Sequence, residues 1–347
     1  MNTDLRRENS RKRNRVPFII LLAVLSVVLV VVVLIMPGNT QIGAGSNDAS
    51  NQDSGAPLEK WQEGVISHDG KEYLYNRDIK TYLIMGIDKD GVVEEETNYT
   101  KGGQSDAMFL LVTDASTKKM SVISINRNTM TRIEAYKMSG EIAGYRTAQI
   151  CLQHGYGDGK NLSCVRAAEA VSYLFYNIPI NGYLAMNMDG MPIMNDAVGG
   201  VTVEVLEDIT SKSRNVSLKK GETVTLTGDE AYVYLRSRDI NEFDSATDRL
   251  RRQEQYITAY MKKLETIVSS DANAAVEIYE ALEDYIVSSI DFAGLVSEVQ
   301  DYSFDSATDM YSVPGETKQG SRYEEYYVDD AAFYRMILDI FYNEVTK

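Results

Sequence analysis

Three apolar segments in the first half of the chain have the composition of buried β-strands. They span residues 80–87, 107–113 and 120–125, and aliphatic, aromatic and β-branched residues dominate each of them. A short polar stretch, 114–119, separates the second segment from the third, and a connection of this length is typical of an antiparallel hairpin. The pattern therefore predicts two strands paired as a hairpin and a third strand nearby.

The rest of the chain alternates helix-like and strand-like patterns. In residues 163–176, Val165, Ala168 and Phe175 follow a helical period, so we expect them to face the core. Because strands and helices alternate with short links, the predicted fold class is α/β: a single α/β/α sandwich with a mixed central sheet. The other expected elements are strands at 181–188, 201–206 and 310–313 and helices at 190–198, 272–287, 292–299 and 329–342.

The N-terminal segment is organised differently. Residues 1–16 hold six basic and two acidic side chains, and residues 18–36 contain no charged side chain. As a helix this uncharged run spans about 28 Å at 1.5 Å per residue, close to the ~30 Å thickness of a bilayer's hydrocarbon core. We therefore expect a transmembrane helix at 17–37, with the basic tail in the cytoplasm and the C-terminal domain extracellular. A cleaved signal peptide is the alternative, although the run is long for one.

A linker is expected between this helix and the folded domain. Residues 38–60 are rich in Gly, Ser, Asn and Asp, a composition that favours a flexible tether. The extracellular domain is expected at 61–347, and its functional motifs lie between residues 80 and 268.

Charge and composition exclude several classes of function. The net charge of −16 argues against nucleic acid as a partner, because nonspecific binding needs a basic surface. His68 and His154 are the two histidines and no Gly-x-Ser-x-Gly is present, which argues against a Ser-His-Asp hydrolase or a zinc enzyme. Cys151 and Cys164 could form one disulfide or remain buried thiols, and both alternatives stay open.

Against this acidic background, residues 226–255 gather five arginines and no lysine. Thr227 and Glu230 have the spacing of a capping box, which predicts a short helix ending near Arg236. Beyond that end the chain should be extended, so that Arg236 and Arg238 project on the same side. Planar guanidinium groups suit phosphate, and the segment is therefore a candidate anion site.

A second helix is predicted to start at Thr247 or Asp248. Arginines in its first turn would act together with free backbone N–H groups and the helix dipole, which also attract anions. The expected buried stripe is Leu250, Ile257, Met261 and Leu264, and the row expected to border a cleft is Arg249, Arg252, Gln253 and Tyr256. The alternative is a solvated charged face on which the arginines pair with Asp239, Glu242, Asp244 and Asp248.

Three charged residues are predicted to meet at one edge of the sheet. Asp88 follows the first strand, Asp106 precedes the second and Arg127 follows the third. In a hairpin the start of one strand lies beside the end of the next, so Asp106 and Arg127 share an edge; Asp88 joins them if the first strand runs alongside the third. Two carboxylates suit Mg²⁺, which combines carboxylate ligands with substrate phosphate oxygens. The alternative is a structural salt bridge with turn-capping aspartates.

Several short motifs occur in a specific order between about residues 82 and 263. They are Gly86-Ile-Asp88, Ser105-Asp106, Ser124-Ile-Asn-Arg127-Asn-Thr129, Ile180-Asn-Gly-Tyr183, Asp189-Gly190, Asp196-Ala-Val-Gly-Gly200, Leu226-Thr-Gly-Asp-Glu-Ala231, Tyr234-Leu-Arg-Ser-Arg238 and Arg249-Leu-Arg-Arg-Gln253. Each is modest alone, but in this order they resemble the LytR-CpsA-Psr family of bacterial envelope proteins.

The resemblance implies a phosphotransferase that moves an anionic glycopolymer, such as a teichoic acid or a capsular polysaccharide, from a polyprenyl-pyrophosphate carrier to a peptidoglycan hydroxyl. It implies that Mg²⁺ is bound by Asp88 and Asp106, and that the polyprenyl chain, a membrane lipid, lies in an apolar groove between sheet and helices. The catalytic arginines that it implies are Arg127, Arg236, Arg238 and Arg249, and the expected substrate contacts are Arg252, Gln253 and Gln104.

Four positions depart from the family pattern. Gln104 stands where an arginine is usual, Asn128 where an aspartate follows the arginine, Gln149 where a lysine is common and Asp248 where a glycine is usual. Two fewer positive charges beside the pyrophosphate would weaken its binding or change the acceptor. The alternative function is a noncatalytic envelope protein that binds lipid-linked polymer or a partner as a scaffold or regulator.

Overall fold

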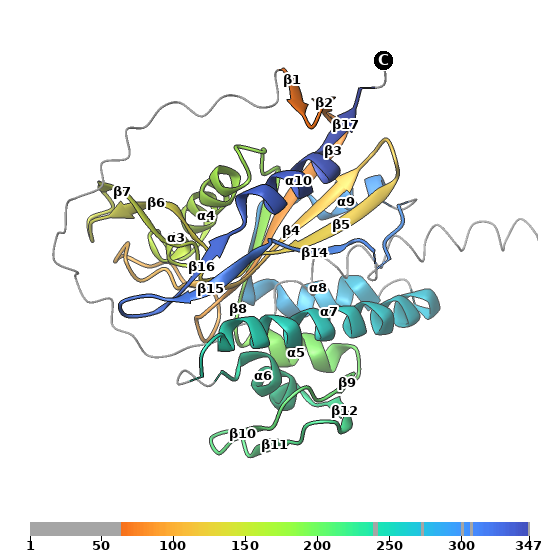
Figure 1. Cartoon of the computed structure of the whole chain (residues 1–347). Helices are drawn as coiled ribbons and strands as arrows, with labels where there is room; N and C mark the ends of the chain where they lie inside the picture. Colours follow the sequence, from red (N-terminus) through yellow and green to blue (C-terminus); the bar gives the residue numbers. More distant parts are fainter. Residues whose placement is uncertain (1–63, 239–241, 272–273, 300–301, 306–307, 346–347) are drawn as a thin grey trace, which may run out of the picture.

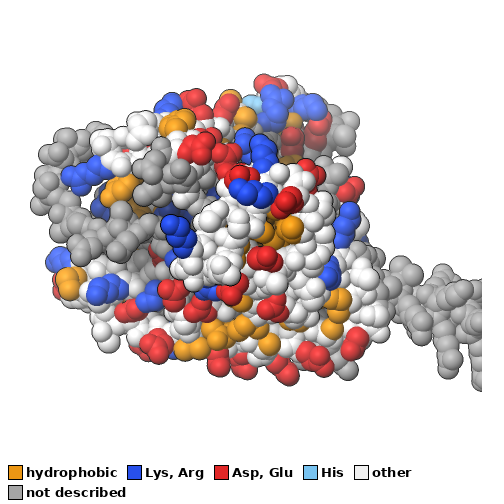
Figure 2. Space-filling model, turned by 90° about the horizontal axis from the view of Figure 1, so that it is seen from below, with side chains coloured by type: hydrophobic (Ala, Val, Ile, Leu, Met, Phe, Trp, Pro, Cys, Tyr) orange, Lys and Arg blue, Asp and Glu red, His pale blue; other side chains and the backbone are white. Residues whose placement is uncertain are grey.

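A computed structural model of the chain describes residues 64–238, 242–271, 274–299, 302–305 and 308–345. The transmembrane helix expected at 17–37 and the linker expected at 38–60 lie outside these residues. Among the helices that are described, none combines the length and apolar character needed to cross a bilayer. Acidic, basic and apolar side chains lie interspersed on the face shown in Figure 2.

A mixed six-stranded sheet forms the middle of the molecule, with the strand order β13-β8-β3-β4-β5-β14 (Figure 1). β3 runs antiparallel to β4 and parallel to β8, while β5 runs antiparallel to β4 and parallel to β14. The strands are β3 (Ile79–Ile87), β4 (Ser105–Asp114), β5 (Lys119–Ser124), β8 (Gly182–Asn187), β13 (Ile286–Ser288) and β14 (Met310–Ser312).

The β4–β5 pairing confirms the hairpin predicted from the short polar turn between these strands. Asp88 was expected to join Asp106 and Arg127 if the first strand ran alongside the third. Instead, β3 pairs with β4 and β8 and does not pair with β5. Asp88 nevertheless reaches the same edge, because Ile87 at the end of β3 lies opposite Ser105 at the start of β4. The sheet therefore delivers Asp88 and Asp106 side by side.

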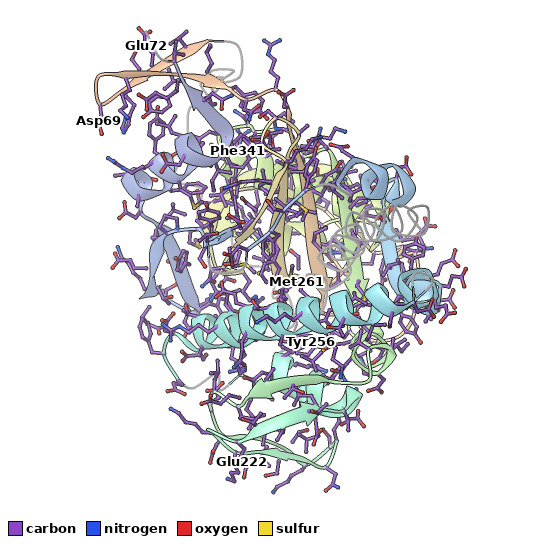
Figure 3. The ribbon with its side chains drawn as sticks, turned by 90° about the vertical axis from the view of Figure 1, so that its right-hand side faces the viewer. Asp69, Glu72, Glu222, Tyr256, Met261 and Phe341 are labelled. Atoms are coloured by element: carbon purple, nitrogen blue, oxygen red, sulfur yellow. The ribbon has the colours of Figure 1, made fainter. Side chains whose placement is uncertain are left out.

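Side chains alternate between the two faces of the sheet, and helices cover both faces (Figures 1 and 3). On β3, Tyr82 and Ile84 join one apolar cluster, whereas Leu83 and Met85 join the other. The predicted α/β/α sandwich is thus confirmed for the described residues. The first cluster includes α5 (Gly190–Ala197), α6 (Gly228–Arg236), α7 (Ser245–Ser270), α8 (Ala274–Leu282) and α9 (Phe292–Val299); the second includes α3 (Leu152–Gly155), α4 (Asn161–Leu174) and α10 (Asp330–Phe341).

Two helices bury a different set of positions from the predicted one. On α4, Val165 is 40% exposed, and the buried positions include Cys164 and Ala167, because the small side chains allow close packing there. On α7, Ile257, Met261 and Leu264 of the predicted stripe are buried, and Leu250 is partly buried. Tyr256, which was expected to border a cleft, is instead fully buried together with Tyr260. α7 contacts α6 and β9 (Val201–Glu204) as well as the sheet-side cluster, so its buried face is broad.

Small antiparallel sheets surround the sandwich, and the apolar pattern did not predict most of them. Their strands are short and half-exposed, so they lack the long apolar runs that mark the central sheet. They are β1 (Val65–His68), β2 (Lys71–Tyr75) and β17 (Tyr342–Glu344); β6 (Met130–Tyr136) and β7 (Ile142–Gln149); β9 and β12 (Thr223–Leu226); β10 (Ile209–Ser211) and β11 (Val216–Leu218); and β15 (Gly315–Gln319) and β16 (Glu324–Val328).

The capping box predicted for α6 is present. Thr227 Oγ1 accepts the backbone N–H of Glu230 at 3.4 Å, and Glu230 Oε2 accepts the backbone N–H of Thr227 at 2.9 Å. Asp229 and Glu230 also place negative charge in the first turn, where the helix dipole favours it. The cap fixes where α6 begins and therefore where Arg236, its last residue, is positioned.

We expect Thr227→Ala to lower the free energy of unfolding by about 1 kcal/mol, because the first turn of α6 loses its side-chain acceptor. Urea unfolding of the folded domain measures the change. Thr223→Ala, at an exposed position on β12, is the matched control and is expected to stay within about 0.5 kcal/mol of the wild type. Equal effects of the two substitutions would contradict the capping role.

Candidate functional site

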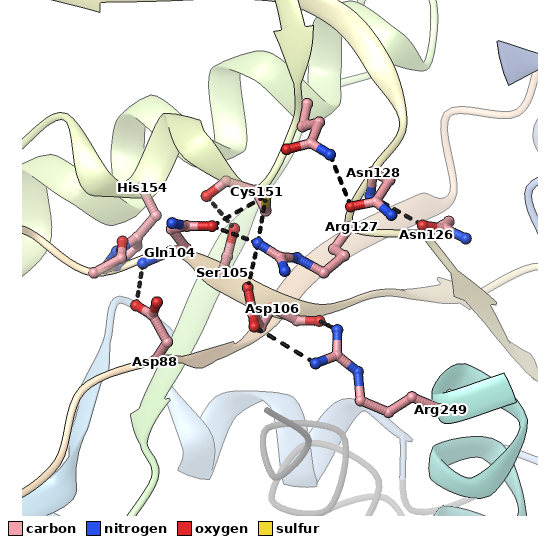
Figure 4. A network of polar contacts seen from close by, with 12 residues as sticks. Asp88, Gln104, Ser105, Asp106, Asn126, Arg127, Asn128, Cys151, His154 and Arg249 are labelled. Atoms are coloured by element: carbon pink, nitrogen blue, oxygen red, sulfur yellow. Dashed lines mark hydrogen bonds and ion pairs between the residues drawn. The ribbon is translucent and has the colours of Figure 1, made fainter. Parts of the chain in front are cut away.

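Asp106 is buried between two arginines from distant parts of the chain (Figure 4). Its carboxylate oxygens lie 2.9 Å from Arg127 Nη2 and 3.6 Å from Arg249 Nη1. Arg127 follows β5, as the hairpin predicted, whereas Arg249 comes from α7, 143 residues after Asp106. Asp106 and Arg249 are only 3% and 2% exposed, so their charges interact with little screening by solvent.

Asp88 lies at the same edge, beside Gln104 (Figure 4). The backbone N–H of Gln104 donates to Asp88 Oδ1, and the N–H of Asp88 donates to the Gln104 carbonyl at 3.0 Å. Burial, followed by the negative charge of Asp106, raises the pKa of Asp88 to about 7. Gly103 has a φ of +83°, and a Cβ there would lie 3.1 Å from Asp88 Oδ1, so glycine is required next to this carboxylate.

The two carboxylates have the chemistry of a magnesium site. No cluster of three or more His, Cys, Asp or Glu side chains suited to a metal ion occurs in the part of the chain that is described. A pair of carboxylates nevertheless fits Mg²⁺, which keeps several waters and shares substrate phosphate oxygens. The negative charge of Asp106 contributes to the raised pKa of Asp88, so the two carboxylates repel each other. A cation bound between them would reduce this repulsion.

The end of α6 brings two further arginines to this edge. Burial lowers the pKa of Arg236 and of Arg238, and the positive charge of Arg127 lowers that of Arg238 further. Burial also lowers the pKa of Arg249 to about 10, with Asp106 opposing and Arg127 and Arg238 adding to the effect. The charge of Asp106 therefore acts on all four arginines predicted from separate motifs: through ion pairs on Arg127 and Arg249, and without direct contact on Arg236 and Arg238.

Buried polar atoms without a hydrogen-bond partner are concentrated here. Most buried polar groups in folded proteins are paired, so such atoms indicate a place where a ligand or ion completes the bonding. Among the described residues the site contributes Asp106 Oδ1, Arg127 Nε, Arg238 Nε, Arg249 Nε, Ser245 Oγ and Glu324 Oε2. Five of these six atoms belong to arginines or carboxylates, the groups that bind charged ligands.

A model of the LytR_cpsA_psr family matches residues 42–338. The chain belongs to the LytR_cpsA_psr family. It is 32% identical over 187 residues to the polyisoprenyl-teichoic acid–peptidoglycan teichoic acid transferase TagU of Bacillus cereus, an alignment that covers 54% of this chain and 53% of that protein. The chain thus spans about half the length of the first curated relatives that it matches.

Two further comparisons extend over more of the chain. TagU of Oceanobacillus iheyensis is 27% identical over 300 residues, which cover 86% of this chain and 84% of that protein. The crystal structure of Bacillus subtilis TagV superposes with a TM-score of 0.59 at 23% identity, covering 76% of this chain and 96% of that one. The second similarity shows a shared fold.

Two of the departures from the LytR_cpsA_psr pattern contact each other. Gln149 Nε2 donates to Asn128 Oδ1 at 3.0 Å, where lysine and aspartate would form an ion pair. Compared with the family pattern, this amide pair lacks one positive charge at position 149 and one negative charge at position 128. Of the two missing positive charges, the one at Gln149 is therefore offset by the missing negative charge at Asn128. Gln104 Oε1 accepts from Arg127 Nη2 and so orients that guanidinium.

The N-terminus of α7 differs from the expected anion site. α7 begins at Ser245, so Arg249 lies one turn inside the helix and not in its first turn. The backbone N–H groups of Thr247 and Asp248 donate to the Asp244 carbonyl, and they are not directed at the arginines. Arg251 fits the alternative of a solvated charged face. Its side chain is 65% exposed, and its Nη1 lies 2.8 Å from Asp248 Oδ1.

Arg252 and Gln253 hold the end of α6. Arg252 Nε donates to the Tyr234 carbonyl at 2.8 Å, Nη2 donates to the Ser237 carbonyl, and Nη1 pairs with Glu207. Gln253 Nε2 lies 3.5 Å from the Leu235 carbonyl. These contacts place both side chains behind Arg236 and Arg238 and not beside Asp106. Their expected contact with substrate stays a prediction, and the structure gives them a positioning role.

Sequence reasoning missed two neighbours of the site. Arg214, between β10 and β11, stacks on the ring of Tyr232, with its guanidinium Cζ 3.6 Å from the ring centroid. The Cζ of Arg236 lies 4.9 Å from the centroid of the same ring. Cys151 Sγ lies 3.2 Å from Arg127 Nη2, and Cys151 and Cys164 are both free and buried, which decides the question left open for these thiols. A lone arginine in a short hairpin and a lone cysteine carry no pattern that could have indicated either contact.

We expect His154 to make stability fall in mild acid. It is buried, its Nδ1 lies 2.9 Å from the Gly103 carbonyl, and burial lowers its pKa to about 4. The unfolded chain takes up a proton below a pKa of about 6.5, so this contribution is present at pH 7 and is lost as pH falls toward 4. By this linkage the loss between pH 7 and pH 5 is about 2 kcal/mol.

Urea unfolding at the two pH values measures this loss for the wild type and for His154→Gln. The variant lacks the titrating group, so its own loss between pH 7 and pH 5 should be smaller by about 2 kcal/mol. An identical pH dependence of the two proteins would show that His154 does not contribute.

Proposed function

We propose that this protein transfers an anionic glycopolymer of the teichoic acid or capsular polysaccharide type from a polyprenyl-pyrophosphate carrier to a peptidoglycan hydroxyl. The observation that carries the proposal is the pairing of Arg127 and Arg249 with the buried Asp106 carboxylate, with the charge of Arg238 close enough to interact with both Arg127 and Asp106. The Nε atoms of all three arginines are unpartnered. The names of the relatives, teichoic acid transferases, support the same reaction. Excess guanidinium in a buried site suits a pyrophosphate with several negative charges.

In the proposed reaction the acceptor hydroxyl attacks the phosphorus next to the polymer, and polyprenyl phosphate departs. Arg127, Arg238 and Arg249 bind the phosphate oxygens and stabilise the charge on the transferring and departing groups. Because Gln104 and Asp106 already orient Arg127, little reorganisation is needed when the substrate binds. Mg²⁺ bound by Asp88 and Asp106 would supply Lewis-acid neutralisation of phosphate oxygens.

The proposal includes a location at the cell membrane. A span at 17–37 would anchor the chain, and the domain outside would reach lipid-linked polymer on one side and peptidoglycan on the other. We place the polyprenyl chain along the apolar layer between the sheet and α5–α9, because the side chains of this layer form one continuous apolar cluster.

We expect Arg249→Ala to lower the rate of transfer by a factor of about 10² to 10³, as for loss of one preorganised oxyanion contact. The assay measures release of polyprenyl phosphate from a polyprenyl-pyrophosphate-linked saccharide in the presence of Mg²⁺ and peptidoglycan fragments. Arg251→Ala is the matched control, because Arg251 lies on the same helix with its side chain 65% exposed. The control should keep its rate within about two-fold, since surface substitutions have small effects.

Wild-type release by Arg249→Ala would exclude the proposed phosphate site. Binding of the lipid-linked saccharide without any release by the wild type, under every divalent ion tested, would favour the noncatalytic scaffold or regulator.

We expect removal of divalent ions with EDTA to abolish release and added Mg²⁺ to restore it, because Asp88 and Asp106 lose the cation that they share with the substrate. Mn²⁺ binding, followed by electron paramagnetic resonance, tests the site directly and without turnover. Asp88→Asn should lose that binding, whereas Asp208→Asn, at an exposed ion pair with Lys219, should retain it. Undiminished Mn²⁺ binding by Asp88→Asn would place the cation elsewhere.

A further inference from the structure

The β15–β16 hairpin is fixed to both segments that deliver arginines to the site. Its Tyr326 N–H donates to the Asn128 carbonyl at 2.9 Å, one residue after Arg127. On the other strand, Thr317 Oγ1 donates to Asp244 Oδ1, directly before α7. Residues from the C-terminal part of the chain therefore form part of the wall around the arginines.

Glu324 is the first residue of β16 and the carboxylate that this hairpin contributes. Its carbonyl accepts Gln149 Nε2 at 2.7 Å, and its Oε1 accepts the backbone N–H of Asp244 at 2.7 Å. Burial and Arg127 lower the pKa of Arg238, and the charge of Glu324 acts in the opposite direction, which places Glu324 in the electrostatic surroundings of that guanidinium. The residue is thus held at the site by contacts on both sides.

The second oxygen of this carboxylate is left without a donor. Glu324 Oε2 is buried and has no hydrogen-bond partner among the described residues. A buried carboxylate oxygen needs a hydrogen-bond donor, and a phosphate with ionised oxygens cannot supply one. A hydroxyl can. The chemistry of this atom therefore points to the acceptor alcohol and not to the pyrophosphate.

The other carboxylates near the site have charged or hydrogen-bonded partners. Asp106 Oδ1 also lacks a hydrogen bond, but its carboxylate forms ion pairs with Arg127 and Arg249. Asp244 Oδ1 accepts the hydroxyls of Thr247 and Thr317. Asp88 accepts the Gln104 N–H and is a proposed metal ligand. Asp239 is a candidate pairing partner for the arginines and, from the sequence alone, a candidate general base, but it lies outside the described residues.

Solvent can reach the side of the hairpin that carries Glu324. Glu324 as a residue is half-buried, although its Oε2 is covered, and the preceding Tyr323 is 53% exposed. The half-buried Glu324 is therefore closer to solvent than the fully buried Asp106 and Arg249.

We propose that Glu324 is a catalytic residue of the transferase, the general base that accepts the proton of the attacking hydroxyl. The inference rests on the proposed function. As the acceptor oxygen bonds to phosphorus, the bond from that phosphorus to the bridging oxygen breaks, and its electron pair leaves with polyprenyl phosphate. The acceptor proton moves to Glu324 Oε2 and is later released to solvent. A positioned carboxylate plays this part in other phosphoryl transfers.

Glu324→Gln tests the assignment, because glutamine keeps the size and the Asp244 contact but cannot accept the proton. We expect kcat to fall by about 10² to 10⁴-fold, the usual contribution of a general base. The dissociation constant for the lipid-linked saccharide should stay within about two-fold, because the arginines are unchanged. With Mg²⁺ at saturation, which would hold Asp88 ionised, the decline of kcat toward acid pH should disappear.

Glu316→Gln is the matched control on the other strand of the hairpin. Glu316 is 69% exposed in its side chain and pairs with Lys318, so its variant should keep the wild-type kcat and pH profile. Thermal unfolding of both variants verifies that the domain is folded. Glu324→Asp keeps the carboxylate and should retain the acid limb of the profile with a kcat between those of the wild type and Glu324→Gln.

Wild-type kcat and pH profile in Glu324→Gln would overturn the assignment. A decrease that keeps the acid limb, or that appears only in KM, would make Glu324 a positioning residue and would also overturn it. Absence of release by the wild type itself would refute the transferase function, and the base with it, so the two failures are distinct.

Discussion

The buried carboxylate of Asp106, shared by Arg127 and Arg249, is the interaction on which the site depends. Removing one member of a buried ion pair leaves an uncompensated charge and costs about 3–5 kcal/mol, so the three side chains hold β4, the segment after β5 and α7 together. The site still carries more positive than negative charge, and burial lowers the pKa of Arg249 to about 10. An anion is therefore what would relieve this arrangement, in a chain whose overall net charge is −16.

The sandwich brings these charges together because each comes from a rigid element. Antiparallel pairing of β3, β4 and β5 fixes Asp88, Asp106 and Arg127 at one edge of the sheet. α7 packs across the apolar face and delivers Arg249, and α6, held by its capping box, ends at Arg236. Sites built on strands and helices in this way hold their geometry better than sites on loops.

Local patterns predicted the elements that depend on local interactions. The apolar runs predicted the three central strands, and the Thr227–Glu230 spacing predicted the cap of α6, because both signals lie within a few residues. The Asp106–Arg127 pair followed from hairpin geometry. The burial of Arg252 against backbone carbonyls of α6 did not follow, because an arginine on a helix has the same local pattern whether it faces a ligand or a neighbouring helix. The β15–β16 hairpin was not predicted because its short, half-exposed strands lack the long apolar runs that mark the central sheet.

The effect of each departure from the family pattern depends on the residues that the changed side chain contacts. Asn128 and Gln149 are hydrogen-bonded to each other, so their changes in charge cancel locally, while Gln104 replaces a charge with an acceptor that orients Arg127. An arginine at position 104 would repel Arg127, whereas the amide fixes it at the carboxylate of Asp106. Fewer charges with better orientation are consistent with catalysis, since preorganisation and not the number of cations determines how well a transition state is stabilised. These substitutions therefore do not by themselves argue for a noncatalytic protein.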